Sequence, residues 1–246
     1  MVTRPKLQAD GIAKLIEDAG ARVLRFPAIE IHSTKSSALA RLIDGLDAFD
    51  LAIFISRNAV EQGLARVRER REWPTGLAIG AIGSGTLRAL QAQGHRNAFA
   101  PEGPSDSEAL LANARLHSIS GKRVVIFRGE GGREFLGSTL RERGAIVEYA
   151  ECYRRSVPAN DPRVLIGELS RGAVHAVVIS SGEGLTNFAG LLGPSAEVLL
   201  AHVPFFVPHP RVAGQASGLG ITETLIAGIA DEETLAALVA YFGRTG

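Results

Sequence analysis

The feature that most constrains the fold is a recurring unit, in which an apolar run is followed by a few small polar residues and then by an amphipathic stretch. Residues 50–60 (DLAIFISRNAV) and 175–185 (HAVVISSGEGL) both have this form. The helical pattern of residues 9–19 ends at Gly20 and that of residues 133–143 ends at Gly144, and glycine is typical of the position just after a helix. Apolar strands alternating with helices of about 10 to 15 residues predict an α/β fold with parallel sheets flanked by helices.

The two halves of the chain resemble each other when the sequence is compared with itself at an offset of 124 residues. The matched pairs are Arg4 with Arg128, Ile16 with Leu140, Gly20 with Gly144, Ala21 with Ala145, Val23 with Val147 and Ser56 with Ser180. The identity is low and could arise by chance. The shared order of the units favours an internal duplication.

The composition limits the kind of partner. The chain has 246 residues, 46% of them hydrophobic, which is enough for two domains with separate cores. Lys plus Arg number 27 and Asp plus Glu 26, so no overall charge favours nucleic acid or an acidic membrane. No apolar run approaches the roughly 20 residues needed to cross a bilayer, and no signal-peptide core follows Met1. We expect a cytoplasmic protein.

The sequence also gives no sign of a metal or redox site. Cys152 is the only cysteine, which excludes an internal disulfide and a C-x-x-C site. The six histidines show no H-E-x-x-H or other paired ligand spacing. We expect no metal site.

In parallel α/β sheets, ligands bind where loops and helix starts follow the carboxyl ends of the strands. This rule predicts the site residues as those that come just after the apolar runs. They are Thr3, Arg4, Ser56, Arg57, Asn58, Gly83, Ser84, Thr86, Arg128, Gly129 and the rest of the loop to Gly132, Ser180, Ser181, Gly182, and residues 208–211 with Arg211.

Two glycine-rich loops could bind an anion. In RGEGGR (128–133), the backbone N–H groups could face an anion at a helix start, or the glycines could simply form a tight turn. In AIGSGT (81–86), Ser84 or Thr86 could cap a helix or donate to a ligand oxygen. Neither loop is a Walker A or dinucleotide-binding motif, which argues against a nucleotide-dependent enzyme.

The remaining motifs could also have a purely structural role. Ser56 and Ser180 lie outside G-x-S-x-G, so helix capping is favoured over serine hydrolase chemistry. Tyr153, beside Arg154 and Arg155, could donate a hydrogen bond near bound anions, although alternation along a strand would also explain a half-buried tyrosine.

Taken together, an ordered set of weak motifs along almost the whole chain resembles the uroporphyrinogen-III synthase family. These motifs are VTRP with Gln8, FISRNAV, AIGSGT with Gly94, PEGPSDSEALL, GKRVVIFRGEGGR, residues 143–145 (RGA), Tyr153, VVISSGEGL and VPHPRVA. Two departures stand out: the first strand is only a few residues long, and HPRVA differs from its repeat counterpart AIGSGT.

The resemblance implies two flavodoxin-like domains joined by a two-stranded connector, with one domain discontinuous in sequence. Here residues 1–33 plus 156–246 would form one domain and residues 34–155 the other. Residues 26–33 and 149–158 would be the crossings. The substrate would lie in the cleft between the domains.

The resemblance also implies a reaction, in which hydroxymethylbilane loses its terminal hydroxyl, inverts ring D and closes to uroporphyrinogen III without a cofactor. Tyr153 aligns with a family tyrosine implicated as an acid toward the leaving hydroxyl. Arg4, Arg128, Arg211 and the helix starts would hold the carboxylates. We expect a monomer that receives its substrate from hydroxymethylbilane synthase. The alternative function is a two-lobed module that binds a small anion without catalysis.

Overall fold

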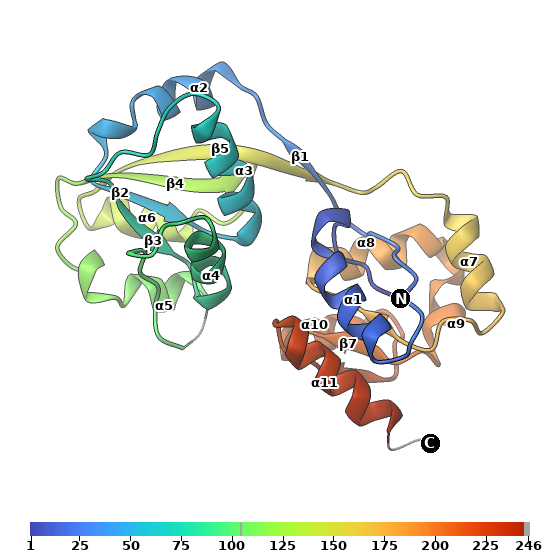
Figure 1. Cartoon of the computed structure of the whole chain (residues 1–246). Coiled ribbons are helices and arrows are strands. Elements are labelled where there is room, and N and C mark those ends of the chain that lie inside the picture. The colour runs from blue at the N-terminus through green and yellow to red at the C-terminus, as the bar shows by residue number, and fades with distance from the viewer. Residues whose placement is uncertain (104, 244–246) are drawn as a thin grey trace. The chain divides into compact units, whose positions relative to one another are not determined.

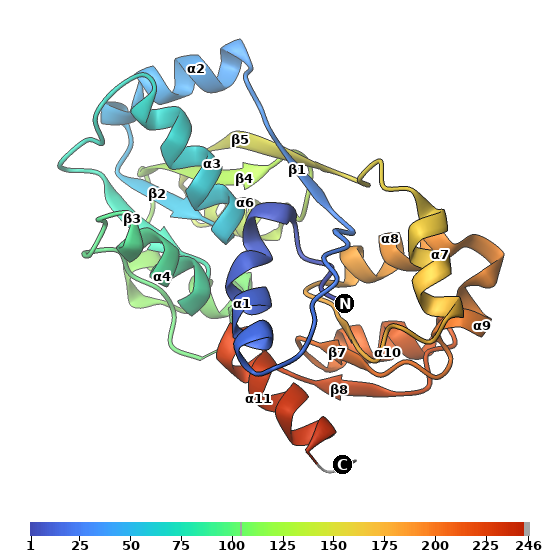
Figure 2. The same ribbon diagram turned by 45° about the vertical axis from the view of Figure 1, so that its right-hand side comes forward.

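The computed structural model describes residues 1–103 and 105–243, and its internal contacts divide the chain into two compact units. One unit comprises Met1–Glu30 and Ser156–Gly246, and the other comprises Ile31–Arg155. Figure 1 labels their helices and strands, and Figure 2 shows them from a second side. No helix among the described residues combines the length and the apolar character that a membrane crossing requires.

The Ile31–Arg155 unit is built on a five-stranded sheet with the order β1-β5-β4-β2-β3. The strands are β1 (Glu30–Ser33), β2 (Leu51–Phe54), β3 (Ala78–Ala81), β4 (Arg123–Gly129) and β5 (Ile146–Ser156). The β2–β3, β2–β4 and β4–β5 pairs are all parallel. Parallel pairing brings the carboxyl ends of these strands to one edge of the sheet.

Helices cover both faces of this sheet because side chains alternate along each strand. One face packs Phe54 and Phe127, whose rings stack 4.5 Å apart, against the helical layer of α2 (Ser37–Asp44), α3 (Arg57–Arg68) and α4 (Ser84–Ala92). The other face packs Ile53 and Ile126 against α5 (Ser107–Leu111) and α6 (Phe135–Glu142). Full burial of such side chains contributes about 1.5–3 kcal/mol each.

The Met1–Glu30 and Ser156–Gly246 unit has a three-stranded parallel sheet in the order β6-β7-β8. These strands are β6 (Val177–Val178), β7 (Phe205–Val207) and β8 (Thr224–Ile226). One core lies under α7 (Pro162–Ser170), α8 (Gly182–Leu192), α9 (Ala196–Leu200) and α10 (Pro210–Ser217), and the opposite core lies under α1 (Asp10–Asp18) and α11 (Asp231–Phe242). Short 3-10 helices occur at Lys6–Gln8, Leu46–Ala48, Ala114–Leu116 and Gly193–Ser195.

The two units share a pairing register. Val2 forms parallel bridges with Arg25 and Val178, and Ile126 pairs with Tyr149 and Ile53. Ile126 therefore corresponds to Val2 and Tyr149 to Arg25, both at the offset of 124 residues. Val178 corresponds to Ile53 at an offset of 125 residues. Equivalent pairing supports the duplication predicted from the sequence, with one extra residue in the second half.

Both predicted helices are present, and one of them begins later than predicted. Helix α1 and its stop at Gly20, where φ is 88°, agree with the predicted helix to within one residue at each end. Helix α6 also stops before Gly144, where φ is 87°, but it begins at Phe135 instead of residue 133. The delay has a local cause, because Gly131 and Gly132 have positive φ and turn the chain before the helix.

Candidate functional site

Ser56, Gly129 and Tyr153 come together at the carboxyl edge of the five-stranded sheet. The Tyr153 hydroxyl lies 3.1 Å from Ser56 Oγ, and Tyr153 is only 2% exposed. Gly129 pairs with Tyr153 across β4 and β5. A Cβ at Gly129 would lie 2.8 Å from the phenol ring, so only glycine admits the ring at this distance.

Ser56 is also the N-cap of α3. Its Oγ accepts the backbone N–H of Ala59 at 3.0 Å, which confirms the predicted capping. In the first turn of α3, Arg57 is exposed and Asn58 is half-buried. The first turn therefore offers the exposed Arg57 guanidinium together with the positive end of the helix dipole.

The predicted hydroxyl cap of the next helix is wrong. Helix α4 begins one residue earlier than that prediction requires, with Gly83 as its N-cap and no side-chain cap bond. Ser84 is exposed and Thr86 is buried in the first turn. A Cβ at Gly83 would lie 2.7 Å from the Cα of Ser105, so the main chain at Ser105 leaves room for glycine alone.

Arg128 is buried and binds its own loop. Its Nε donates to the Gly129 carbonyl at 3.2 Å and to the Gly131 carbonyl at 3.0 Å, and its Nη2 also binds the Gly131 carbonyl. Its Nη1 lies 2.8 Å from a carboxylate oxygen of Glu134. The Gly131 carbonyl thus faces the guanidinium, and α6 starts only at Phe135. Binding of an anion by the N–H groups of this loop stays a prediction.

Glu134 and Tyr149 complete this cluster. The Tyr149 hydroxyl donates to Glu134 at 2.6 Å, and the Arg128 guanidinium lies 4.5 Å from the centre of the Tyr149 ring. The hydrogen bond from Tyr149, followed by that from Arg128, lowers the pKa of Glu134. Burial, followed by the bond to Glu134, raises the pKa of Tyr149. The cluster thus favours a carboxylate beside a neutral phenol.

Arg4 has a corresponding position in the other unit. It is buried and pairs with Asp231, the first residue of α11. Among the described residues its Nε is buried without a hydrogen-bond partner. The neighbouring Thr3 hydroxyl donates to the Val178 carbonyl at 2.9 Å.

The remaining predicted residues follow β6 and β7 of this unit. Ser181 is the N-cap of α8 and accepts the Gly184 N–H at 3.1 Å, whereas Ser180 is exposed. The sequence match of Ser56 with Ser180 is therefore off by one residue. Arg211 is exposed in the first turn of α10, which begins after His209.

Sequence reasoning missed Glu134, Tyr149 and Asp231. Two of them, Glu134 and Asp231, are acidic residues at helix starts, a placement that the helix dipole favours. That signal could have marked them as partners for the buried arginines. The described residues contain no cluster of three or more His, Cys, Asp or Glu side chains that could hold a metal ion.

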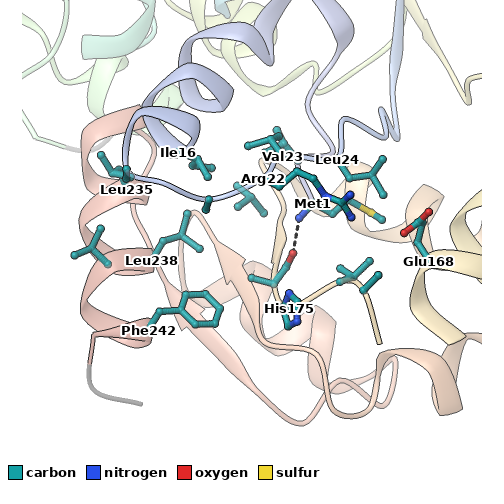
Figure 3. Close-up of a pocket in the computed structure, with 18 residues that line it drawn as sticks. Met1, Ile16, Arg22, Val23, Leu24, Glu168, His175, Leu235, Leu238 and Phe242 are labelled. Atoms are coloured by element: carbon teal, nitrogen blue, oxygen red, sulfur yellow. Dashed lines mark hydrogen bonds between the residues drawn. The ribbon is translucent and has the colours of Figure 1, made fainter. Parts of the chain in front are cut away.

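A cavity of about 750 Å³ in the Met1–Glu30 and Ser156–Gly246 unit lies away from the predicted residues. Figure 3 shows Ile16 of α1 and Leu235, Leu238 and Phe242 of α11 among its lining residues. His175, which precedes β6, also lines it, so the cavity lies toward the amino ends of the strands. Its mostly apolar lining does not suit a polycarboxylate.

Comparison with solved structures supports the fold. A mutant uroporphyrinogen III synthase from the thermophilic bacterium Thermus thermophilus aligns with a TM-score of 0.64 at 16% identity, covering 100% of this chain and 98% of the other. The synthetase from Helicobacter pylori 26695 aligns with a TM-score of 0.61 at 15% identity, covering 90% and 96%. These likenesses confirm a mixed α/β fold with parallel sheets flanked by helices.

Comparison with sequences identifies the family. The family described as "Uroporphyrinogen-III synthase HemD" matches residues 10–240. The uroporphyrinogen-III synthase of Escherichia coli K12 is 32% identical over 240 residues, 96% of this chain and 97% of the relative. That of Proteus mirabilis is 36% identical over 157 residues, 63% of this chain and 79% of the relative. The chain therefore belongs to the uroporphyrinogen-III synthase family.

Proposed function

We propose that the chain converts hydroxymethylbilane to uroporphyrinogen III. The observation that carries this proposal is the Tyr153 hydroxyl at the strand-end edge, hydrogen-bonded to Ser56 and enclosed by Gly129, in a chain of this family. A phenol is a donor of one hydrogen bond, which suits a single departing hydroxyl.

In this proposal Tyr153 donates a proton toward the terminal hydroxyl as its C–O bond breaks and water leaves. Ring D is inverted, and closure gives the macrocycle. Without the enzyme, closure gives the type I isomer, so the protein must favour one geometry of the chain as well as a faster rate.

The substrate carries eight carboxylates, and we propose that several helix starts share them. Backbone N–H groups at the starts of α3 and α8, with the exposed side chains of Arg57 and Arg211, are suited to solvated anions. Buried Arg4 and Arg128 already have acidic partners. In this assignment they orient the strand-end loops, while Gly83, Ser84 and Thr86 offer the start of α4.

We further propose that the chain has two flavodoxin-like domains, residues 1–33 plus 156–246 and residues 34–155, with a two-stranded connector. The division into two compact units near these boundaries supports this proposal, as does the adjacency of β1 and β5, which end at Ser33 and Ser156. We also propose that the protein is a cytoplasmic monomer that receives hydroxymethylbilane from its synthase.

The test is an isomer assay with freshly made hydroxymethylbilane. We expect the purified protein to give the type III isomer, while the protein-free control gives type I. Recovery of type I alone would contradict the proposal. Tight binding of uroporphyrin without any change in the isomer ratio would instead support a binding module.

A further inference from the structure

We propose that Ser56 is a positioning residue that donates its hydroxyl proton to Tyr153 and so directs the proton of Tyr153 toward the ligand. This inference rests on the proposed function, because it assumes that Tyr153 protonates the leaving hydroxyl. It gives Ser56 a role in the chemical step in place of the predicted contact with a carboxylate.

Either hydroxyl can donate in the Ser56–Tyr153 bond, and we assign the donor role to Ser56 from its other partner. Its Oγ accepts the N–H of Ala59 at 3.0 Å and lies 3.1 Å from the Tyr153 hydroxyl. An amide N–H can only donate, so the serine proton cannot go to Ala59. Among the described residues, Tyr153 Oη is the one acceptor within hydrogen-bond distance of Ser56 Oγ.

The tyrosine cannot turn away from this bond. Its ring is buried against Gly129, and its own carbonyl accepts the N–H of Glu130 at 2.7 Å. When Ser56 donates to the phenol oxygen, the phenol proton must point in another direction. Ser56 therefore fixes the rotation of the Tyr153 O–H bond.

The start of α3 strengthens this arrangement. Ser56 accepts an N–H from the positive end of a twelve-residue helix, and accepting one hydrogen bond makes a hydroxyl a better donor of the next. The bond from Ser56 stabilises the phenol oxygen as it gives up its proton. The resulting relay runs from the Ala59 amide through Ser56 and Tyr153 to the leaving hydroxyl.

Ser56→Asp separates capping from orientation. Aspartate caps helices as well as serine does, but an ionised carboxylate has no proton to donate to Tyr153. We expect S56D to keep the melting temperature and to lower kcat by roughly 10- to 100-fold, the usual effect of losing an orienting partner. Repulsion of substrate carboxylates by the added charge would change KM, so the two effects are measured separately.

Two further variants act as controls. Ser56→Thr retains both the cap and the donor, and we expect it to restore most of kcat. Ser36→Ala removes a matched cap, because Ser36 accepts the N–H of Leu39 at 3.0 Å at the start of α2. Ser56→Ala, which removes the cap of α3, serves as the reference. We expect S36A to lower the melting temperature as much as S56A does, with unchanged kcat.

The decisive measurement is a double-mutant cycle with Tyr153→Phe. If Ser56 acts through the phenol, S56D should cost nothing further in kcat once that hydroxyl is absent. The inference would be overturned if S56D had wild-type kcat, or if S56D lowered kcat equally in the wild-type and Y153F backgrounds. In either case, formation of the type III isomer by the wild type would still uphold the proposed function. Failure of the wild type to form type III would refute the proposed function itself.

Discussion

The two units use the same helix start in different surroundings. Ser56 and Ser181 each accept the backbone N–H three residues later, at 3.0 and 3.1 Å. Ser56 faces the phenol of Tyr153, whereas the offset of 124 places Ile29 at the equivalent position. A Cβ at Gly184 would lie 3.2 Å from Ser181 Oγ and 3.7 Å from Ile29 Cδ1, so this cap lies near a hydrocarbon chain. The serine caps a helix in both units, and a phenol lies within hydrogen-bond distance of the cap at Ser56.

The buried arginines make a second comparison. Arg4 and Arg128, also 124 residues apart, both pair with an acidic residue at a helix start. The partners differ in solvation, because the Asp231 side chain is 23% exposed and the Glu134 side chain is 60% exposed. A repeated arginine with a repeated acidic partner favours a structural role for this position over direct contact with the substrate.

The largest expected effect comes from removing the phenol that distinguishes the units. Tyr153→Phe should lower kcat by roughly 10² to 10⁴-fold, the range for lost general acid catalysis, with a small change in KM. Steady-state kinetics with separation of the product isomers measures both quantities.

The matched control is Tyr241→Phe, which removes a phenol bonded to Glu223 on the surface of the other unit. We expect it to keep wild-type kcat. An equal loss of activity in both variants, or none in Y153F, would show that the phenol beside Ser56 has no special role.

The next largest effect concerns the arginine pairs. Asp231→Ala leaves Arg4 buried without its acidic partner, and we expect a loss of about 2–3 kcal/mol in the free energy of unfolding. Glu134→Ala should cost less, because Arg128 keeps its hydrogen bonds to the Gly129 and Gly131 carbonyls and lies 3.9 Å from a second carboxylate, that of Glu151. Urea unfolding of both variants tests the order, and the reverse order would break the comparison.

The sequence predicted the α/β fold and the strand-end residues because both follow from local patterns. Ser56 as a cap and Gly20 as a helix stop are examples. The contact between Ser56 and Tyr153 was not predictable, because it depends on the register of β5 against β4, which shifts between Arg128 and Gly129. Local sequence does not determine a register of this kind.

The partners of the buried arginines were unpredictable for a related reason. Asp231 is distant from Arg4 in sequence, so only the packed fold brings them together. The Arg128 loop holds a contact that its glycines do not reveal. In the structure, Gly131 and Gly132 have positive φ, and the Gly131 carbonyl accepts a hydrogen bond from the Arg128 guanidinium.

A smaller effect should follow from crowding the tyrosine. In Gly129→Ala, the new Cβ would lie 2.8 Å from the Tyr153 ring, and we expect a loss of about 1–3 kcal/mol in stability together with reduced kcat. Gly190→Ala is the control, since no atom lies within 4 Å of its Cβ and alanine favours a helix. Wild-type kcat in G129A would show that the phenol tolerates displacement.

The smallest effect at neutral pH concerns Cys152, next to Tyr153 and 124 residues after the buried Ala28. Burial raises the pKa of the Cys152 thiol from 9.0 to about 12. Because the folded state holds this proton more tightly than the unfolded state, the thiol's contribution to stability is complete below pH 9 and is lost as pH rises toward 12. Cys152→Ala introduces the residue found at the equivalent position of the other unit. We expect this variant to retain activity, and its free energy of unfolding should fall less steeply than that of the wild type above about pH 9.

Reaction of the native thiol with iodoacetamide gives an independent measurement. Since the thiolate is the nucleophile, alkylation at about pH 8 should be slow in the folded protein and fast in urea. Rapid alkylation without unfolding would mean that β5, which contains both Cys152 and Tyr153, opens to solvent. The phenol of Tyr153 would then not be held in a fixed position, and this difference between the two units would be lost.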